Sequence, residues 1–226
     1  MTIQSSARTA PAGHLHGERI DELIETLATD GFAVAEDFLP RPLVAGLIEA
    51  AAAREAAGGM ARAAIGRSAA RTFESEVRRV EAAWLDGRCS AEAEFLALAE
   101  TLRLAINRRL YLGLFEFEAQ FLTYAPGGFY RRHLDSLAGS RNRIVSMVSY
   151  LNRDWQPAHG GELDVWRRPD DHGAPAVTLA PRAGSMVLML SEEIPHAARP
   201  AAAVRRVIAG WFRVNASGSA RVDPAR

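Results

Sequence analysis

Lysine is absent from this sequence of 226 residues, so all 27 of its basic side chains are arginines. Walker-type phosphate-binding loops and enzymes that form a Schiff base both depend on a lysine amine. The missing lysine therefore excludes these two large classes of function.

The chain also has little cysteine and no net charge. Its one cysteine, Cys89, has no partner in the chain for a disulfide, and the first residues, Met1 to Gly17, lack the apolar run of a secretory signal. No stretch is apolar enough to span a bilayer. The 27 basic residues balance 27 acidic ones, so nothing draws the whole chain to nucleic acid or an anionic membrane. We therefore expect a cytoplasmic protein with no membrane segment and no nucleic-acid partner.

The length and the 48% of hydrophobic residues suit one domain with one sizeable core. We expect this domain to span residues 17–214, between flexible tails of residues 1–16 and 215–226. Residues 17–112 show apolar side chains at steps of three and four, which is typical of amphipathic helices. The expected elements are a helix at 18–29, a short strand at 32–34, a helix opened by Pro40 or Pro42 and ended by Gly58 and Gly59, and a helix at 91–110 with Ser90 as N-cap.

Residues 113–214 have a different texture, because apolar runs of strand length are separated by Pro, Gly and Asn turns. Short strands behind a helical part indicate an α+β protein with a double-stranded β-helix, or jelly-roll, core braced by the N-terminal helices. The expected strands are at 115–124, 144–151, 161–166, 186–190 and 204–212.

The segment from Gly58 to Thr72 is rich in glycine, alanine and arginine and has little to bury. Loops of this length inside a compact domain often have a functional role. We expect this one to cover or bind a substrate.

His133 and Asp135 are the first candidates for metal binding. They lie two apart in an extended stretch, so on a strand they would project from one face. His196, much later in the chain, is the third candidate, because a closed β-roll can bring it beside them. Two histidines and one carboxylate that leave other positions open are typical of non-haem Fe(II) oxygenases. The remaining histidines, at positions 14, 16, 159 and 172, fall in tail or turn sequence and are interpreted as solvated.

An arginine follows His196 at a distance that suits a second anchor. Arg205 comes nine positions later, so a strand, a turn and a returning strand can place it near the metal without binding it. A planar guanidinium can hold the far carboxylate of a 2-oxo dicarboxylate that chelates the iron. Both faces of the strand at 204–212 are partly apolar, so the pattern leaves the choice between Arg205 and Arg206 open.

Together, these motifs resemble the catalytic domain of the 2-oxoglutarate/Fe(II)-dependent prolyl hydroxylases, above all the branch of the hypoxia-sensing enzymes and their bacterial relatives. The resemblance covers about residues 75 to 213. It is carried by the run Tyr124-Ala-Pro-Gly-Gly-Phe-Tyr-Arg-Arg-His133-Leu-Asp135, by Tyr150-Leu151-Asn152-Arg-Asp-Trp155, by Gly160-Gly161-Glu-Leu163, by Pro195-His196, and by Arg205 through Trp211-Phe212.

By this resemblance, His133, Asp135 and His196 are the iron ligands and Arg205 binds the distal carboxylate of 2-oxoglutarate. Tyr124 and Tyr150 correspond to tyrosines that line the 2-oxoglutarate pocket. The implied cofactors are Fe(II), 2-oxoglutarate as co-substrate and O2, with ascorbate as a further candidate. Leu163 and Trp211 match wall positions of that pocket.

The chain departs from the pattern of the hypoxia-sensing enzymes at two positions. Val80 stands where they carry an aspartate, and Ala209 where they carry a threonine. The leading hypothesis for the function is hydroxylation of a prolyl residue in a protein partner, with succinate and CO2 as co-products. The alternatives are the same chemistry on a free amino acid or other small molecule, and a cupin-like barrel or inactive partner-binding module that does not oxidise. The sequence does not indicate the oligomeric state.

Overall fold

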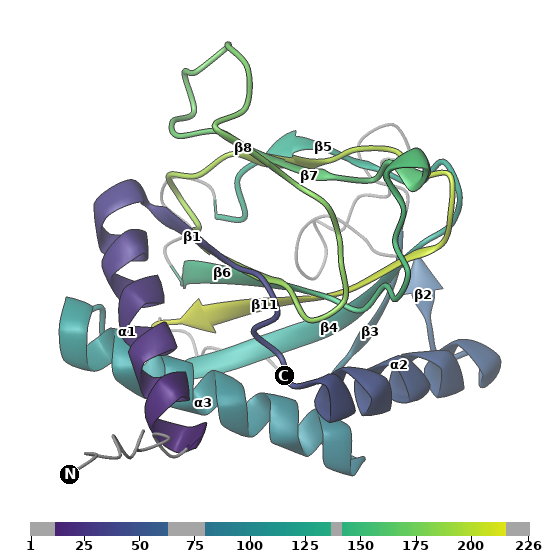
Figure 1. Cartoon of the computed structure of the whole chain (residues 1–226), viewed down its shortest axis with the longest axis horizontal. Helices are drawn as coiled ribbons and strands as arrows, with labels where there is room; N and C mark the ends of the chain where they lie inside the picture. The colour runs from purple at the N-terminus through teal and green to yellow at the C-terminus, as the bar shows by residue number, and fades with distance from the viewer. Residues whose placement is uncertain (1–11, 63–79, 137–141, 216–226) are drawn as a thin grey trace, which may run out of the picture.

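The computed structural model describes residues 12–62, 80–136 and 142–215, in which two antiparallel sheets face each other and three helices cover the outer side of the larger sheet (Figure 1). The helices are α1 (Ala12–Asp30), α2 (Arg41–Ala56) and α3 (Ser90–Leu110), and a 3-10 turn, η2, spans Pro157–His159. Within these described ranges, no helix combines the length and the apolar character that a membrane span requires. The expected α+β jelly roll is confirmed.

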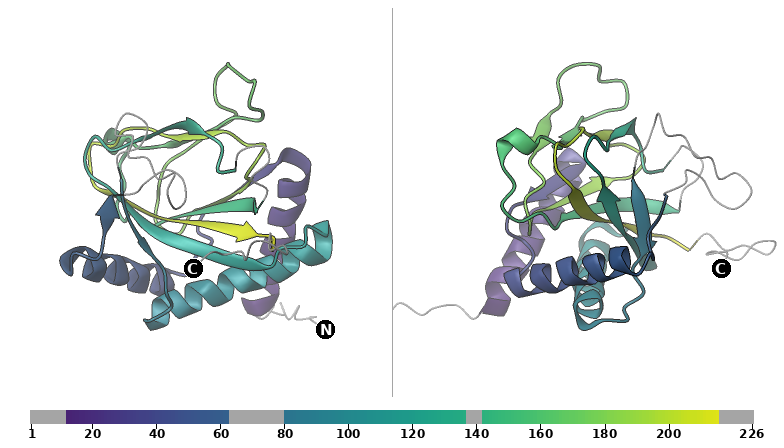
Figure 2. Two further views of the ribbon diagram at one scale, coloured as in Figure 1. Left: turned by 180° about the vertical axis from the view of Figure 1, so that it is seen from behind. Right: turned by 90° about the vertical axis from the view of Figure 1, so that its right-hand side faces the viewer.

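The two sheets differ in size. The strands of the larger sheet, in spatial order, are β1 (Phe32–Ala35), β9 (Met186–Leu190), β6 (Arg143–Tyr150), β11 (Arg205–Arg213), β4 (Glu116–Tyr124), β3 (Glu81–Trp84) and β2 (Ala61–Arg62). Those of the smaller sheet are β5 (Tyr130–His133), β10 (His196–Ala198), β7 (Leu163–Val165) and β8 (Val177–Leu179). The turned views show the same layering, with the helices on the far side of the large sheet from the small one (Figure 2).

Alternation along the strands of the large sheet builds two separate cores. Phe121 of β4 faces the helices, where it joins the buried α3 residues Phe95 and Leu102. The next residue, Leu122, faces the small sheet and joins an inter-sheet core with Val207 of β11. The functional candidates on β11 and β4 therefore lie on the face that the small sheet covers.

Several expected boundaries are corrected. The first helix begins at Ala12, so the prediction of a tail is wrong for residues 12–16, and residues 1–11 lie outside the described part. Ser90 is already helical, and Cys89 is the N-cap residue without a side-chain cap bond. Capping by Ser90 is therefore wrong. The buried Glu92 carboxylate, in the first turn, accepts hydrogen bonds from the backbone N–H groups of residues 86 and 87 and so ties the preceding loop to the helix.

The N-terminal half also contributes strands to the large sheet. β1 was expected, whereas β2 and β3 were not, so residues 17–112 are not purely helical. Part of the expected loop from Gly58 to Thr72 is strand, because Ala61 and Arg62 pair with β3. Residues 63–72 lie outside the described part, as do residues 216–226 of the expected C-terminal tail.

A partly buried ion pair links the end of α2 to β11. Arg206 donates two hydrogen bonds to Glu55, at 2.9 and 2.7 Å, and Thr123 of β4 donates a third at 2.7 Å. The hydrogen bond from Arg206 is the main reason why the pKa of Glu55 is lowered from its ordinary value. A lowered pKa means that the carboxylate stabilises the fold above its unfolded pKa and loses this effect as the pH falls through the folded one.

We therefore expect a pH-dependent coupling between Glu55 and Arg206. A double-mutant cycle with Glu55→Gln and Arg206→Ala, measured by urea unfolding, should give about 1 kcal/mol at pH 7. The coupling should vanish in acid, once Glu55 is protonated. A coupling that is the same at pH 7 and in acid would contradict the ion-pair interpretation.

Candidate metal centre and co-substrate pocket

The three predicted metal ligands lie together at the edge of the small sheet. His133 ends β5 and His196 begins β10, and the two residues are register partners across these strands. Asp135 lies just beyond the end of β5, in a bend, so the expectation that it shares an extended strand with His133 is wrong. One ligand atom from each side chain lies within 4.8 Å of the others. Within the described residues, no other group of histidine, cysteine and acidic side chains has this geometry.

Backbone carbonyls fix the orientation of both imidazoles. His133 Nδ1 lies 2.8 Å from the carbonyl of Arg131, and His196 Nδ1 lies 3.2 Å from the carbonyl of Ile194. With Nδ1 donating to a carbonyl, Nε2 carries the lone pair. Both Nε2 atoms point at the Asp135 carboxylate, at 3.5 and 3.6 Å. The three donor atoms thus converge on a space that suits one cation.

Electrostatics keep the cluster in the protonation state that a metal needs. Burial acts to raise the pKa of Asp135, but His196 and His133 outweigh it, so the pKa is lowered below its ordinary value. Burial, and then His133, lower the pKa of His196 to about 4. At neutral pH the carboxylate is therefore ionised and His196 is neutral, which is the form in which each binds a metal.

Arg205, at the start of β11, lies on the inner face of the large sheet and is only 2% exposed. Its Nη1 donates to the Gly161 carbonyl at 2.6 Å, and its guanidinium carbon lies 4.0 Å from the centre of the Tyr124 ring. Nε and Nη2 are buried and have no hydrogen-bond partner among the described residues. Arg206 points to the opposite face, toward Glu55, so the structure distinguishes two arginines that the sequence pattern left equivalent.

Two other arginines show which kind of partner the unpartnered edge of Arg205 can bind. Arg199 binds Asp164 through Nε and Nη2, and Arg206 binds Glu55 through the same two atoms. Arg205 presents this same edge, yet within the described part of the chain it forms no ion pair. A buried guanidinium without a counter-ion is unfavourable, and Nε with Nη2 matches a carboxylate bidentately. The residues present therefore fit an anionic ligand with a carboxylate at this point.

Tyr150 of β6 adds a second unpartnered group beside Arg205. Its hydroxyl is buried without a partner among the described residues. Burial is the main cause that raises the pKa of Tyr150, so the phenol keeps its proton at neutral pH and can donate a hydrogen bond. Tyr124 contributes its ring face to the guanidinium. Arg205, Tyr124 and Tyr150 thus lie together as the sequence predicted.

Ser146 connects the pocket with the metal cluster, and sequence reasoning missed it. It alternates with Tyr150 on the inner face of β6, and its hydroxyl is bonded to both Asp135 and Ser191 Oγ, the latter at 2.8 Å. The period-two pattern of β6 could have placed Ser146 beside Tyr150, but nothing in the sequence links it to Asp135. The cluster and the arginine therefore face the same interior between the sheets.

The remaining residues singled out from the sequence lie outside the metal cluster. Leu163 and Trp211 are buried in the inter-sheet core, as expected for wall residues. His172 is exposed, as expected. His159 is half-exposed in the turn η2, so it is partly solvated as expected, but its Nδ1 also accepts a hydrogen bond from the backbone N–H of Gln156 and its ring packs edge-on against Trp155.

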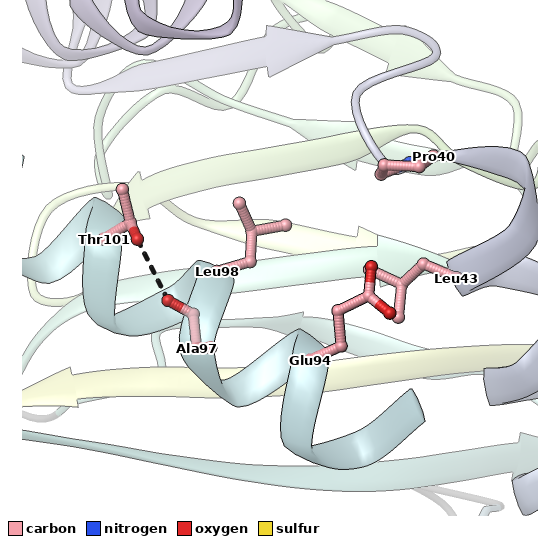
Figure 3. Close-up of a pocket in the computed structure, with 6 residues that line it drawn as sticks. All are labelled: Pro40, Leu43, Glu94, Ala97, Leu98 and Thr101. Atoms are coloured by element: carbon pink, nitrogen blue, oxygen red, sulfur yellow. Dashed lines mark hydrogen bonds between the residues drawn. The ribbon is translucent and has the colours of Figure 1, made fainter. Parts of the chain in front are cut away.

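A groove of about 310 Å³ lies elsewhere, on the helical layer (Figure 3). Pro40 and Leu43 at the start of α2 face one side of α3 across it, and Thr101 Oγ1 donates to the carbonyl of Ala97 at 3.0 Å. The groove has a single acidic side chain, Glu94, and no histidine. It is therefore separate from the candidate metal centre.

Comparisons with known proteins identify the family. The model of the 2OG-Fe(II) oxygenase superfamily matches residues 119–213, which include all the metal and pocket candidates. A prolyl-4-hydroxylase from Pseudomonas putida is 38% identical, with a TM-score of 0.77, over 86% of this chain and 98% of that one.

Two more distant structures share the fold. A prolyl hydroxylase from Trichoplax adhaerens, in complex with a hypoxia inducible factor peptide fragment, has a TM-score of 0.78 at 22% identity, over 91% of this chain and 94% of that one. A prolyl 4-hydroxylase from Phytophthora capsici has a TM-score of 0.71 at 20% identity, over 94% of this chain and 68% of that one.

The identity to the Pseudomonas putida enzyme over almost its whole length, together with the match to the superfamily model, confirms the resemblance drawn from the motifs. This chain belongs to the 2-oxoglutarate/Fe(II)-dependent dioxygenases of the prolyl 4-hydroxylase family, which use Fe(II), 2-oxoglutarate and O2.

Proposed function

We propose that this protein hydroxylates a prolyl residue in a protein substrate, with His133, Asp135 and His196 as the iron ligands. The observation that carries the oxygenase chemistry is the buried edge of Arg205, whose Nε and Nη2 lack a partner among the described residues, and the prolyl substrate is supported by the 38% identity to a prolyl-4-hydroxylase. An oxygenase that uses a dicarboxylate co-substrate needs such a group, whereas a barrel that only binds metal does not.

Fe(II), when bound with 2-oxoglutarate and O2, would supply the oxidising chemistry that inserts oxygen into a C–H bond and leaves succinate and CO2. The protein's own residues bind and orient the metal and the co-substrate. Three side-chain ligands leave coordination positions free for co-substrate and oxygen. Arg205 holds the distal carboxylate of 2-oxoglutarate bidentately, and the Tyr150 hydroxyl donates a further hydrogen bond to it. The inter-sheet core around these residues excludes water.

A protein substrate is supported by the surface where the inner face of the large sheet reaches solvent. Trp84 of β3 is 50% exposed there. Arg143 lies 3.6 Å from the centre of the Trp211 ring and donates two hydrogen bonds to Glu118 of β4. Aromatic and arginine side chains are enriched where proteins bind other proteins. The structure from Trichoplax adhaerens, similar in fold, is described with a bound peptide.

The departures from the hypoxia-sensing enzymes bear on which protein is bound. Val80, in place of an aspartate, is buried in the inter-sheet core and offers substrate no charge. We therefore propose a different substrate sequence, and we place the reaction in a reducing cytoplasm. This location suits Cys89, which is an exposed free thiol.

The test is a mass-spectrometric comparison of cells that carry the wild-type protein with cells that carry His133→Ala. We expect a protein whose proline gains about 16 Da, the mass of one oxygen atom, only with the wild type, because the variant lacks a proposed metal ligand. An unmodified proteome, combined with turnover of a free amino acid by the purified enzyme, would instead support the small-molecule alternative.

A further inference from the structure

Two backbone carbonyls fix one end of the Arg205 guanidinium. Nη1 donates to the Gly161 carbonyl at 2.6 Å and lies 3.3 Å from the Arg199 carbonyl. The guanidinium is planar and rigid, so fixing Nη1 also fixes the direction of the opposite edge, Nε with Nη2. The positions of these two carbonyls therefore decide where Arg205 can hold a carboxylate.

The Arg199 carbonyl is held by the strands of the small sheet. The Arg199 side chain binds Asp164 of β7 through two hydrogen bonds, at 2.7 and 2.8 Å, and Thr178 of β8 donates to the same carboxylate. The Arg199 backbone N–H donates to the Glu162 carbonyl at 2.9 Å. The position of the Arg199 carbonyl is therefore fixed by its contacts with the small sheet.

The Gly161 carbonyl depends on a tight turn. Gly161 has a φ of +71°, and a Cβ there would lie 2.7 Å from the Ala201 Cβ and 3.3 Å from the Trp155 ring. Its backbone N–H donates to the Pro200 carbonyl at 3.0 Å. Gly161 is therefore enclosed between Ala201 on one side and Trp155 on the other.

Trp155 secures this turn from the other side. It is only 9% exposed, and its indole Nε1 donates to the Gly160 carbonyl at 2.9 Å. The edge of its ring packs against His159, with the ring centres 5.0 Å apart. Trp155 thus donates a hydrogen bond to Gly160 and packs beside Gly161, whose carbonyl binds Arg205.

We propose that Trp155 is a positioning residue for the co-substrate. By fixing the Gly160–Gly161 turn it holds the carbonyl that orients Arg205, and it thereby sets the preference for a 2-oxo acid with a distal carboxylate. Trp155 does not touch the co-substrate itself. This inference rests on the proposed role of Arg205 in binding 2-oxoglutarate.

Trp155→Phe removes the indole N–H and part of the ring. Its matched control is Trp166→Phe, because Trp166 Nε1 makes the same kind of bond, to the Gly173 carbonyl at 3.0 Å, in the loop between β7 and β8. Two probes are titrated anaerobically into the Fe(II)-loaded protein. One is 2-oxoglutarate, and the other is 2-oxopentanoate, which has a methyl group in place of the distal carboxylate.

We expect Trp155→Phe to raise the dissociation constant of 2-oxoglutarate about tenfold, because a reoriented Arg205 loses about one hydrogen bond to the distal carboxylate. The dissociation constants of 2-oxopentanoate and of Fe(II) should stay within about twofold, because neither ligand uses the edge of Arg205. Trp166→Phe should leave all three constants unchanged.

Two results would overturn the inference alone: 2-oxoglutarate affinity equal to that of the wild type, or an equal loss for both acids, which indicates general damage. A wild-type protein that binds 2-oxoglutarate no better than 2-oxopentanoate would instead refute the proposed role of Arg205. The role of Trp155 is thus tested by the Trp155→Phe variant, and the role of Arg205 by the wild-type protein.

Discussion

Replacement of His133 by alanine is expected to lower the affinity for Fe(II) by about a hundredfold or more and to abolish turnover. The Nε2 atoms of His133 and His196 both point at the Asp135 carboxylate, so the variant leaves only two side-chain donors in a site built for three. The measurement is anaerobic titration of Fe(II) in the presence of 2-oxoglutarate. The weak visible charge-transfer band of the iron chelate should form with the wild type and not with the variant.

His172→Ala is the matched control, because this histidine is exposed in the loop between β7 and β8 and is not a member of the cluster. It should bind Fe(II) with the affinity of the wild type. The assignment of the ligands would be wrong if His133→Ala bound Fe(II) as tightly as the control does.

Replacement of Arg205 by alanine is expected to raise the dissociation constant of 2-oxoglutarate at least about a hundredfold. The variant loses two charge-assisted hydrogen bonds to a carboxylate, each of which contributes about 1.5–3 kcal/mol. Fe(II) affinity should change by less than about threefold, because the two proposed histidine ligands lie on the small sheet and keep their carbonyl contacts. Calorimetry with each ligand in turn measures the two effects separately.

Arg206→Ala is the matched control for Arg205→Ala. The two arginines are neighbours on β11, but Arg206 faces outward and binds Glu55. Its loss should lower stability slightly and leave 2-oxoglutarate affinity unchanged. An Arg205→Ala variant with wild-type affinity for 2-oxoglutarate would refute the role assigned to Arg205.

Much of the fold could be predicted from local patterns. The apolar spacing of Phe95, Leu102 and Ile106 predicted α3, and all three side chains are buried against the large sheet. The strand β9 lies at the predicted residues, Met186 to Leu190. The pairing of β2 with β3 could not be predicted, because such short strands carry no periodic signal and β3 depends on its pairing with β4.

The candidate site was predicted in its composition rather than in its geometry. The motifs named His133, Asp135 and His196, and the structure brings them together. The prediction of a shared strand for His133 and Asp135 was wrong, because β5 ends at His133. The hydroxyl of Ser146 and the carbonyl of Gly161 escaped prediction, because each acts through a contact between segments that are distant in the chain.

The sequence by itself determined which chemistry this protein has. The absence of lysine removed whole classes of enzyme, and the linked motifs around His133, Asp135, His196 and Arg205 indicated an iron oxygenase that uses 2-oxoglutarate. Only the tertiary structure decided which arginine faces the interior. On an isolated strand, Arg205 and Arg206 differ only in the face to which they point. In the folded protein the small sheet covers Arg205, which has no counter-ion among the described residues, whereas Arg206 lies on the side of α2 and pairs with Glu55.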